Sequence, residues 1–204
     1  MQRIGYLFII LFVSLSIASC AHRAITQPVP IAYLAHYRND PENVKQVISK
    51  ASALSKEHLG YQFGSDNPAT GAMDCSGVIY YLLKEIKDIS IPRDSYQMYF
   101  WLLRNGKIHY VTNEHFNSYQ FHALRPGDLL FWTGTFQTNR RPPITHVMLY
   151  LGKNKKGEPL MFGSSNGIYK NKEIFGVSVF NFTLPTKYER DRLVAYGCIP
   201  GFTC

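Results

Sequence analysis

Helical and strand-like patterns occupy different halves of this chain, and this separation constrains the fold more than any other feature of the sequence. Apolar residues repeat with helical spacing over 44–54, after Asp40 as a candidate N-cap, and further helices are predicted over 75–86 and 96–103. The second half instead has short apolar runs bounded by turn residues. These runs are Leu129–Trp132, Val147–Leu151, Leu160–Phe162, Val177–Phe180 and Leu193–Tyr196. Helices followed by strands with hairpin-length connections are typical of an α+β fold with an antiparallel sheet.

The composition fits one globular domain with a tail. Of the 204 residues, 46% are hydrophobic and 18% are charged, which excludes disorder as the main state and leaves scarcely enough length for two domains. A multi-span membrane protein, a coiled coil and a collagen-like fibre are excluded as well. The net charge of +8 favours anionic partners, but no nucleic-acid-binding motif is present. We therefore expect no nucleic-acid partner.

The first twenty residues have the parts of an export signal. Arg3 supplies a positive charge, an apolar run extends from Leu7 to Ile17, and two small residues follow. The run is shorter than the roughly 20 apolar residues that span a bilayer, although an N-terminal anchor or a buried helix remains the alternative. Ile17-Ala18-Ser19-Cys20 resembles the bacterial lipobox. The resemblance implies that residues 1–19 are a lipoprotein signal peptide and that Cys20 becomes acylated.

The lipobox resemblance also implies a location and a domain boundary. Ala21, rather than an aspartate, follows Cys20, and by the sorting preference of Gram-negative lipoproteins this implies anchoring to the outer membrane on its periplasmic face. Several acyl chains give stable anchoring, whereas one chain is marginal. We expect a lipidated tether over 20–38 and one domain over 39–204.

Cys75 stands where a turn-rich loop over 64–71 meets the second predicted helix, and Asp74 is a candidate cap for that helix. A thiol reacts as the thiolate, which the partial positive charge at a helix N-terminus favours. Backbone amides at the same place can stabilise an oxyanion. The alternative for a lone cysteine in a helix is a buried and inert side chain.

A nucleophilic cysteine needs a base within hydrogen-bonding distance, and His146 is the best placed of the seven histidines. It directly precedes the apolar run Val147–Leu151, so the start of a strand would hold its imidazole rigidly. The other histidines lie in or near the tether, before the turn-rich loop or in the polar central stretch. A structural role is an equally good interpretation for a lone histidine of this kind.

Five motifs in a fixed order extend this pair of residues into a family pattern. They are Tyr61–Gly64, Ala72–Gly77, Ile91–Gln97, Leu124–Phe131 and Thr145–Gly152. Together they resemble the NlpC/P60 family of papain-like cysteine peptidases. Each motif alone is weakly specific, whereas five in order are strongly specific, and the resemblance extends from about Val44 to Phe182.

The resemblance implies a papain-like core in which the nucleophile helix packs on an antiparallel β-sheet. It implies that Cys75 is the nucleophile and His146 the general base. It further implies that the Tyr61 hydroxyl lines the site, and that Asp74 and Ser76 shape a pocket for a substrate amine. Members of the family cleave stem-peptide bonds of peptidoglycan, commonly between D-glutamate and a diamino acid, without a metal or an organic cofactor.

Two features depart from the family pattern. The residue that orients the general base belongs where this chain has Phe162, which cannot accept a hydrogen bond. Ser164 is the predicted substitute because it shares strand parity with Phe162, with Ser165, Asn166 or a backbone carbonyl as alternatives. The second departure is the polar, basic loop Thr133–Ile144, which we interpret as an insertion that walls the cleft.

Cys198 and Cys204 flank a Pro-Gly turn at the C-terminus. Their close spacing and an oxidising compartment favour a disulfide between them, with two free thiols as the alternative.

The sequence therefore predicts a monomeric, lipid-anchored enzyme that cleaves peptidoglycan stem peptides by Cys–His chemistry. One alternative is a catalytically weak wall-binding lipoprotein on the same fold, suggested by Phe162 at the orienting position. Another is an amidase or acyltransferase, because one fold supports related thiol chemistry.

Overall fold

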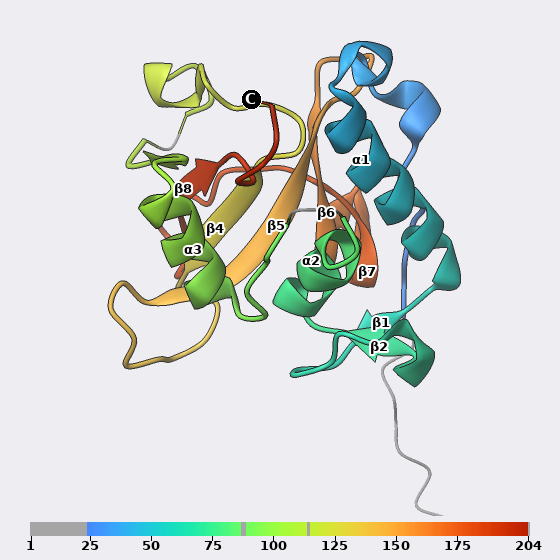
Figure 1. The fold of residues 1–204 in the computed structure, drawn as a ribbon, viewed down its shortest axis with the longest axis horizontal. Coiled ribbons are helices and arrows are strands. Elements are labelled where there is room, and N and C mark those ends of the chain that lie inside the picture. Colours follow the sequence, from blue (N-terminus) through green and yellow to red (C-terminus); the bar gives the residue numbers. More distant parts are fainter. Residues whose placement is uncertain (1–23, 87–88, 114, 204) are drawn as a thin grey trace, which may run out of the picture.

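The computed structural model describes residues 24–86, 89–113 and 115–203, and its centre is a six-stranded antiparallel sheet in the order β3-β8-β4-β5-β6-β7 (Figure 1). These strands are β3 (Ile108–Tyr110), β4 (Leu129–Thr133), β5 (Ile144–Lys153), β6 (Pro159–Tyr169), β7 (Lys172–Asn181) and β8 (Arg192–Gly197). A separate parallel pair is formed by β1 (Gly60–Tyr61) and β2 (Ala72–Met73). The helices are α1 (Glu42–Leu54), α2 (Cys75–Leu83) and α3 (Ser95–Arg104). The predicted α+β fold with an antiparallel sheet is confirmed.

Most of the predicted elements are present. Each of the five apolar runs lies within one of the strands β4 to β8, and the helix predicted over 96–103 is α3. The N-cap predicted at Asp40 is wrong by one residue, because α1 begins at Glu42 and Pro41 occupies the cap position without a side-chain hydrogen bond. Strands β1, β2 and β3 were not predicted, since runs of two or three residues carry no period to detect.

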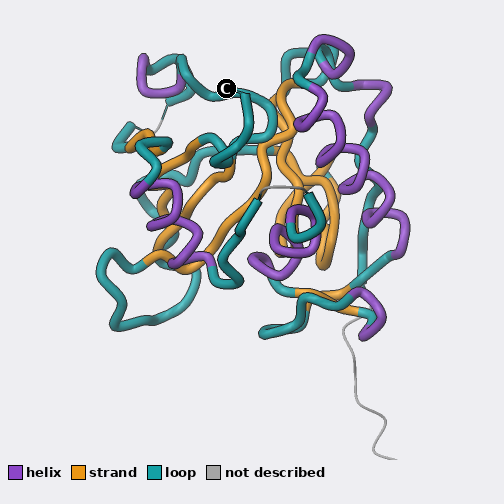
Figure 2. Tube along the Cα trace, in the orientation of Figure 1, coloured by secondary structure: helices purple, strands orange, loops and turns teal. Residues whose placement is uncertain are grey.

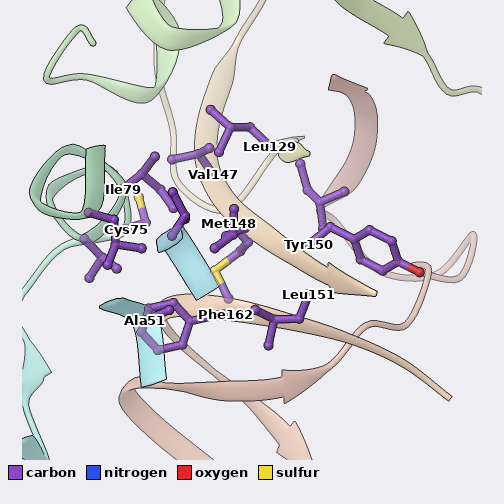
Figure 3. Packing of buried hydrophobic residues seen from close by; sticks show 14 of the residues in the cluster. Ala51, Cys75, Ile79, Leu129, Val147, Met148, Tyr150, Leu151 and Phe162 are labelled. Atoms are coloured by element: carbon purple, nitrogen blue, oxygen red, sulfur yellow. The ribbon is translucent and has the colours of Figure 1, made fainter. Parts of the chain in front are cut away.

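Helices α2 and α3 pack on one face of the sheet. The ring of Tyr99 in α3 lies 5.8 Å from the ring of Phe131 in β4. Phe131 pairs with Val147 of β5, and paired residues direct their side chains to the same face. Figure 3 shows Val147 beside Cys75 and Ile79 of α2 on that face. Figure 2 shows the strands gathered in the centre, with α1 and α3 on opposite sides.

The segment predicted as a tether packs against the domain from its first described residues. Ile25 forms a β-bridge with Phe175 of β7, and the segment then runs beside α1 (Figure 1). The backbone amide of Val29 donates to the Ser55 hydroxyl at 3.0 Å, and both Val29 and Leu34 are buried. These apolar side chains and paired backbone groups attach residues 24–34 to the domain, so this part of the predicted tether is packed on it.

Strands β5 and β6 pair over only part of their length. The two strands pair from Leu149, which lies opposite Phe162, to Lys153, which lies opposite Pro159. Outside this stretch β5 pairs only with β4, and β6 pairs only with β7. The side chain of Met148 fills part of the resulting space, since a Cβ atom on Gly163 would lie 2.5 Å from its sulfur. The start of β5 therefore has an unpaired edge, and the N-terminus of α2 lies against it.

Within the described residues, no helix is long and apolar enough to cross a membrane.

Candidate active site

Cys75 is the first residue of α2, and the carboxylate of Asp74 caps this helix. Asp74 Oδ1 accepts a hydrogen bond from the backbone amide of Gly77 at 2.6 Å, as expected of an N-cap aspartate. This cap fixes the first turn of the helix and leaves the amides of Cys75 and Ser76 free to face the sulfur.

Three backbone amides surround the sulfur of Cys75, and they belong to Val147, Ser76 and Cys75 itself. The Val147 amide is available because β6 has diverged from this part of β5. Burial raises the pKa of the Cys75 thiol to about 11 despite the three amides, which act in the opposite direction. The Cys75 side chain is therefore a neutral thiol at neutral pH. Its sulfur contacts the backbone amide of Val147, the residue that follows His146.

His146 lies at the start of β5, half-buried, with its side chain on the opposite face from Val147. It pairs across the strands with Trp132 of β4, and their ring centroids are 5.7 Å apart. Burial lowers the pKa of His146 to about 4, although the negative charge of Asp74 opposes this shift. No described residue hydrogen-bonds to the imidazole, which is neutral at neutral pH and able to accept a proton.

The orienting role predicted for Ser164 does not match its position. Its side chain is fully buried, and its hydroxyl donates to the Met73 carbonyl oxygen at 2.6 Å, which links β6 to β2. The register explains the error: Phe162 pairs with Leu149 of β5, so Phe162 and Ser164 lie on the same face of the sheet as Val147, whereas His146 lies on the other face. Ser165 and Asn166, the two alternatives, line the same cavities as His146.

Asp74 and Ser76, predicted to bind substrate, belong to an internal network with Arg93. Arg93 Nη2 bonds Asp74 Oδ2 at 2.9 Å, and Arg93 Nη1 bonds both Asp74 Oδ1 and the Ser76 hydroxyl. The Gly64 amide donates to Asp74 Oδ2 at 2.7 Å. A carboxylate has about four acceptor positions, so those of Asp74 are already occupied and it serves as a scaffold.

Arg93 was not among the predicted site residues. It lies in the motif Ile91–Gln97, but its distance along the chain from Asp74 gave no sign that they pair. Its Nε also bonds Asp66 Oδ2 at 3.0 Å, so one guanidinium joins the turn-rich loop to the start of α2.

Tyr61 is placed as the resemblance implied, in the cleft beside the thiol. Burial raises its pKa to about 12, and the nearby Cys75 and Asp74 act in the same direction. The phenol is therefore protonated at neutral pH, and no described residue hydrogen-bonds to it. Its hydroxyl is available to a substrate.

Three adjoining cavities form one continuous cleft. The thiol cavity, of about 350 Å³, is lined by Tyr61, Phe63, Gly64, Asp74, Cys75, Ser76, Arg93, Asp94, Ser95, Phe136, Thr138, Arg140 and Thr145. The bridging cavity, of about 510 Å³, shares Tyr61, Phe63, Phe136 and Thr145 with it and adds His146. The far groove, of about 810 Å³, shares Thr135, His146, Ser165 and Asn166 with the bridging cavity and continues beyond them. The cleft thus leads from Cys75 past His146 to a groove on the other side.

The loop Thr133–Ile144 does line the cleft. Arg140 Nη1 lies 2.9 Å from both carboxylate oxygens of Asp94, and its guanidinium lies 5.3 Å from the ring of Tyr96. The Phe136 ring meets the Phe63 ring edge-on at 6.4 Å. These contacts attach the loop to the N-terminus of α3 and to the opposite wall of the cleft.

The remaining cysteines lie away from this cleft or outside the described residues. Cys198 is buried and disulfide-bonded. Cys204, its predicted partner, and Cys20 lie outside the described residues, so the pairing and the lipidation stay predictions. Among the described residues, no group of three or more His, Cys, Asp or Glu side chains is placed to hold a metal ion.

Substitution of Gly77 tests how the turn-rich loop supports the first turn of α2. A Cβ atom at Gly77 would lie 2.1 Å from the Ser65 carbonyl oxygen, a backbone atom. We expect Gly77→Ala to reduce the free energy of unfolding by about 1–3 kcal/mol, as overpacked cores do, measured by urea denaturation. Gly60→Ala is the matched control, since its Cβ would lie 3.6 Å from that of Ala72. Equal stability of the two variants would contradict this account.

Comparison with known proteins agrees with this geometry. The family model described as "NlpC/P60 family" matches residues 58–173. Over 117 residues the chain is 35% identical to the murein DD-endopeptidase MepH of Escherichia coli (strain K12), covering 54% of this chain and 37% of that protein. It is 29% identical over 136 residues to the probable endopeptidase YafL of the same strain, covering 66% of this chain and 48% of that protein. It is 24% identical over 139 residues to the gamma-DL-glutamyl hydrolase of Bacillus subtilis (strain 168), covering 64% of this chain and 29% of that protein.

The chain spans between 29% and 48% of the length of these relatives. A lipoprotein-like crystal structure of the NLP/P60 family from Staphylococcus aureus superposes with a TM-score of 0.48 at 24% identity, covering 78% of this chain and 42% of that one. Because the family model covers more than half of the 204 residues, including Cys75 and His146, this chain belongs to the NlpC/P60 family.

Proposed function

We propose that this protein is a cell-wall endopeptidase that cleaves peptide bonds in the stem peptides of peptidoglycan. One observation carries the proposal: the Cys75 sulfur contacts the amide of the residue after His146, and both side chains line one continuous cleft. The names of the relatives, two endopeptidases and a gamma-DL-glutamyl hydrolase, support the substrate class.

In the proposed mechanism, Cys75 attacks the carbonyl carbon while its proton passes to the neutral imidazole of His146. The directions of the two pKa shifts favour this concerted transfer over a preformed thiolate–imidazolium pair. The amides that face the sulfur are suited to hold the oxyanion. The imidazolium then protonates the leaving nitrogen as the carbon–nitrogen bond breaks. The neutral imidazole that this leaves then removes a proton from water, and the water oxygen attacks the acyl carbon and displaces the sulfur, which takes that proton back from the imidazolium to regenerate the thiol.

Ser165 and Asn166 are the proposed positioning residues for His146. Both line the cavities that contain the imidazole, and the Asn166 side chain has no hydrogen-bond partner among the described residues. This proposal replaces Ser164, whose hydroxyl is used by Met73.

A catalytically weak wall-binding protein is the second candidate function. The observation that favours it is the combination of a buried thiol with a raised pKa and an imidazole that no described residue orients. The two candidates differ in turnover, since a binding protein retains muropeptides without releasing new amines.

Removal of either reacting group tests the mechanism. We expect Cys75→Ala and His146→Gln each to reduce the release of amines from purified muropeptides at least about a thousandfold, because nucleophile and base act as a unit. Mass spectrometry identifies the products and hence the bond. His115→Gln, an exposed histidine outside the cleft, is the control that keeps full activity. Wild-type protein that releases nothing, or a Cys75→Ala variant as active as wild type, would refute the proposal.

The pH dependence of kcat/KM tests the state of His146. Its pKa is lowered to about 4, and the base form exists above that pKa. We therefore expect activity to persist below pH 6.5 and to fall only as the pH drops through about 4, while circular dichroism monitors folding. Loss of activity near pH 6.5 in folded protein would contradict the burial of this imidazole.

We also propose that the domain is exported and anchored through acylated Cys20, followed by a very short tether. The lipobox-like sequence supports the anchor. The packing of the chain from Ile25 onward limits the span from Cys20 to Ala24, four residues, to about 14 Å. Such a span would hold the enzyme close to the membrane surface.

Replacement of Cys20 tests this anchor. We expect full-length wild-type protein produced in a Gram-negative host to fractionate with membranes. Cys20→Ala protein should instead retain its signal peptide and lack the mass of the acyl chains. A wild-type mass without acyl chains would rule out the lipid anchor, whatever the outcome of the activity assays.

A further inference from the structure

Three contacts form a closed circuit around the thiol cavity, and two of them are ionic. Arg93, which precedes the N-cap of α3, binds Asp66 of the turn-rich loop through its Nε at 3.0 Å. Arg140 of the loop Thr133–Ile144 binds both carboxylate oxygens of Asp94, the N-cap itself, at 2.9 Å. These ion pairs join the two loops through the start of α3, and a contact between two aromatic rings completes the circuit.

The aromatic contact joins Phe63, which directly precedes the turn-rich loop, to Phe136 of the opposite loop. Their rings meet edge-on with centroids 6.4 Å apart. Both residues line the thiol cavity and the bridging cavity, whereas Cys75 lines only the first of these two and His146 only the second. During acyl transfer the carbonyl carbon bonds to sulfur, and the leaving nitrogen receives its proton from the imidazole. The scissile bond therefore lies where the two cavities join, beside the pair of rings.

The backbone next to each ring is held in place. On one side, the Gly64 amide donates to Asp74 Oδ2 at 2.7 Å. On the other side, the Thr135 hydroxyl donates to Thr145 Oγ1 at 2.8 Å, and Thr145 is buried. The room beside the scissile bond is thus set by the two side chains and not by movement of a whole loop.

The ring contact is the weakest member of the circuit. Phe63 is 77% exposed and Phe136 is 41% exposed, so a single edge contact holds them together. The attachment of the loop to α3 is stronger, because the Arg140 guanidinium also lies over the Tyr96 ring and the Tyr96 hydroxyl donates to the Arg141 carbonyl oxygen at 3.1 Å. A substrate that needs more room must therefore displace the Phe63 ring and lose its contact with Phe136.

We infer that Phe63 and Phe136 are specificity-determining residues, which limit the substrate to a small substituent on the carbon atom next to the scissile carbonyl. This inference rests on the proposed peptidase function and specifies the acyl part of its substrate. A small substituent fits while the rings stay in contact. A branched substituent has to separate them, since the two ion pairs prevent the rest of the circuit from widening.

The test uses two synthetic peptides that contain the bond cleaved in muropeptides. They share the leaving part and differ only at the carbon atom next to the scissile carbonyl, which carries its native substituent in one peptide and an isobutyl group in the other. We expect kcat/KM of the wild-type protein to be at least about tenfold higher for the native peptide, the scale on which a packed site discriminates added methylene groups. Phe136→Ala should raise kcat/KM for the isobutyl peptide and so reduce this ratio at least about fivefold.

Further variants test whether the two rings act as a pair. Phe63→Ala should reduce the ratio as Phe136→Ala does, and the double variant should reduce it no further, because loss of either ring already opens the circuit. Phe136→Tyr keeps an aromatic ring and should retain the wild-type ratio. Tyr119→Ala is the matched control and should leave the ratio unchanged, since Tyr119 is 78% exposed, like Phe63, and lies outside the three cavities of the cleft.

Equal cleavage of both peptides by the wild-type protein overturns the inference. So does an unaltered ratio in Phe63→Ala and Phe136→Ala proteins whose circular dichroism shows that they are folded. Effects that add in the double variant overturn the paired action, because each ring would then restrict the substrate separately.

Failure of this inference is distinct from failure of the proposed function. If the wild-type protein cleaves muropeptides but accepts the isobutyl group equally well, the function stands and the role of the two rings falls. If the wild-type protein cleaves no muropeptide, the proposed function itself falls.

Discussion

The carboxylate of Asp74 is the interaction on which the rest of the site depends. Its two oxygens cap α2 through Gly77, hold the turn-rich loop through Gly64 and bind the Arg93 guanidinium. The position of Cys75 follows directly, because the capped turn fixes the first residue of the helix. Loss of this carboxylate would leave a partly buried Arg93 without its main counter-charge, a costly state in a protein interior.

The divergence of β5 from β6 makes the helix terminus into a reactive site. If β5 and β6 had continued to pair beyond Leu149 and Phe162, β6 would cover the edge of β5 and no cleft would separate these strands. Instead, the Val147 amide faces the Cys75 sulfur, and His146 projects into a cleft between the diverging strands. The geometry of the proposed chemistry therefore comes from an interrupted sheet as much as from a helix.

Much of the site was predictable, because its key residues have strong local signals. Cys75 follows a capping aspartate, and His146 precedes a long apolar run, so both could be placed at the ends of elements. The role of Ser164 could not be predicted, since it depends on the register between β5 and β6, which puts Phe162 and Ser164 on the face of the sheet opposite His146. Arg93 was missed for a related reason, because its pairing with Asp74 joins segments that no local pattern connects.

By itself, the sequence determined the class of fold, the order of its main elements and the identity of the two candidate reacting residues. These depend on periodicity, capping and motif order, which are written along the chain. Only the tertiary structure decided that Asp74 is a scaffold, that residues 24–34 pack on the domain and that the cleft continues beyond His146 to Asp191. These depend on contacts between distant segments and on where a strand leaves its neighbour, which are set by the packing of the whole domain.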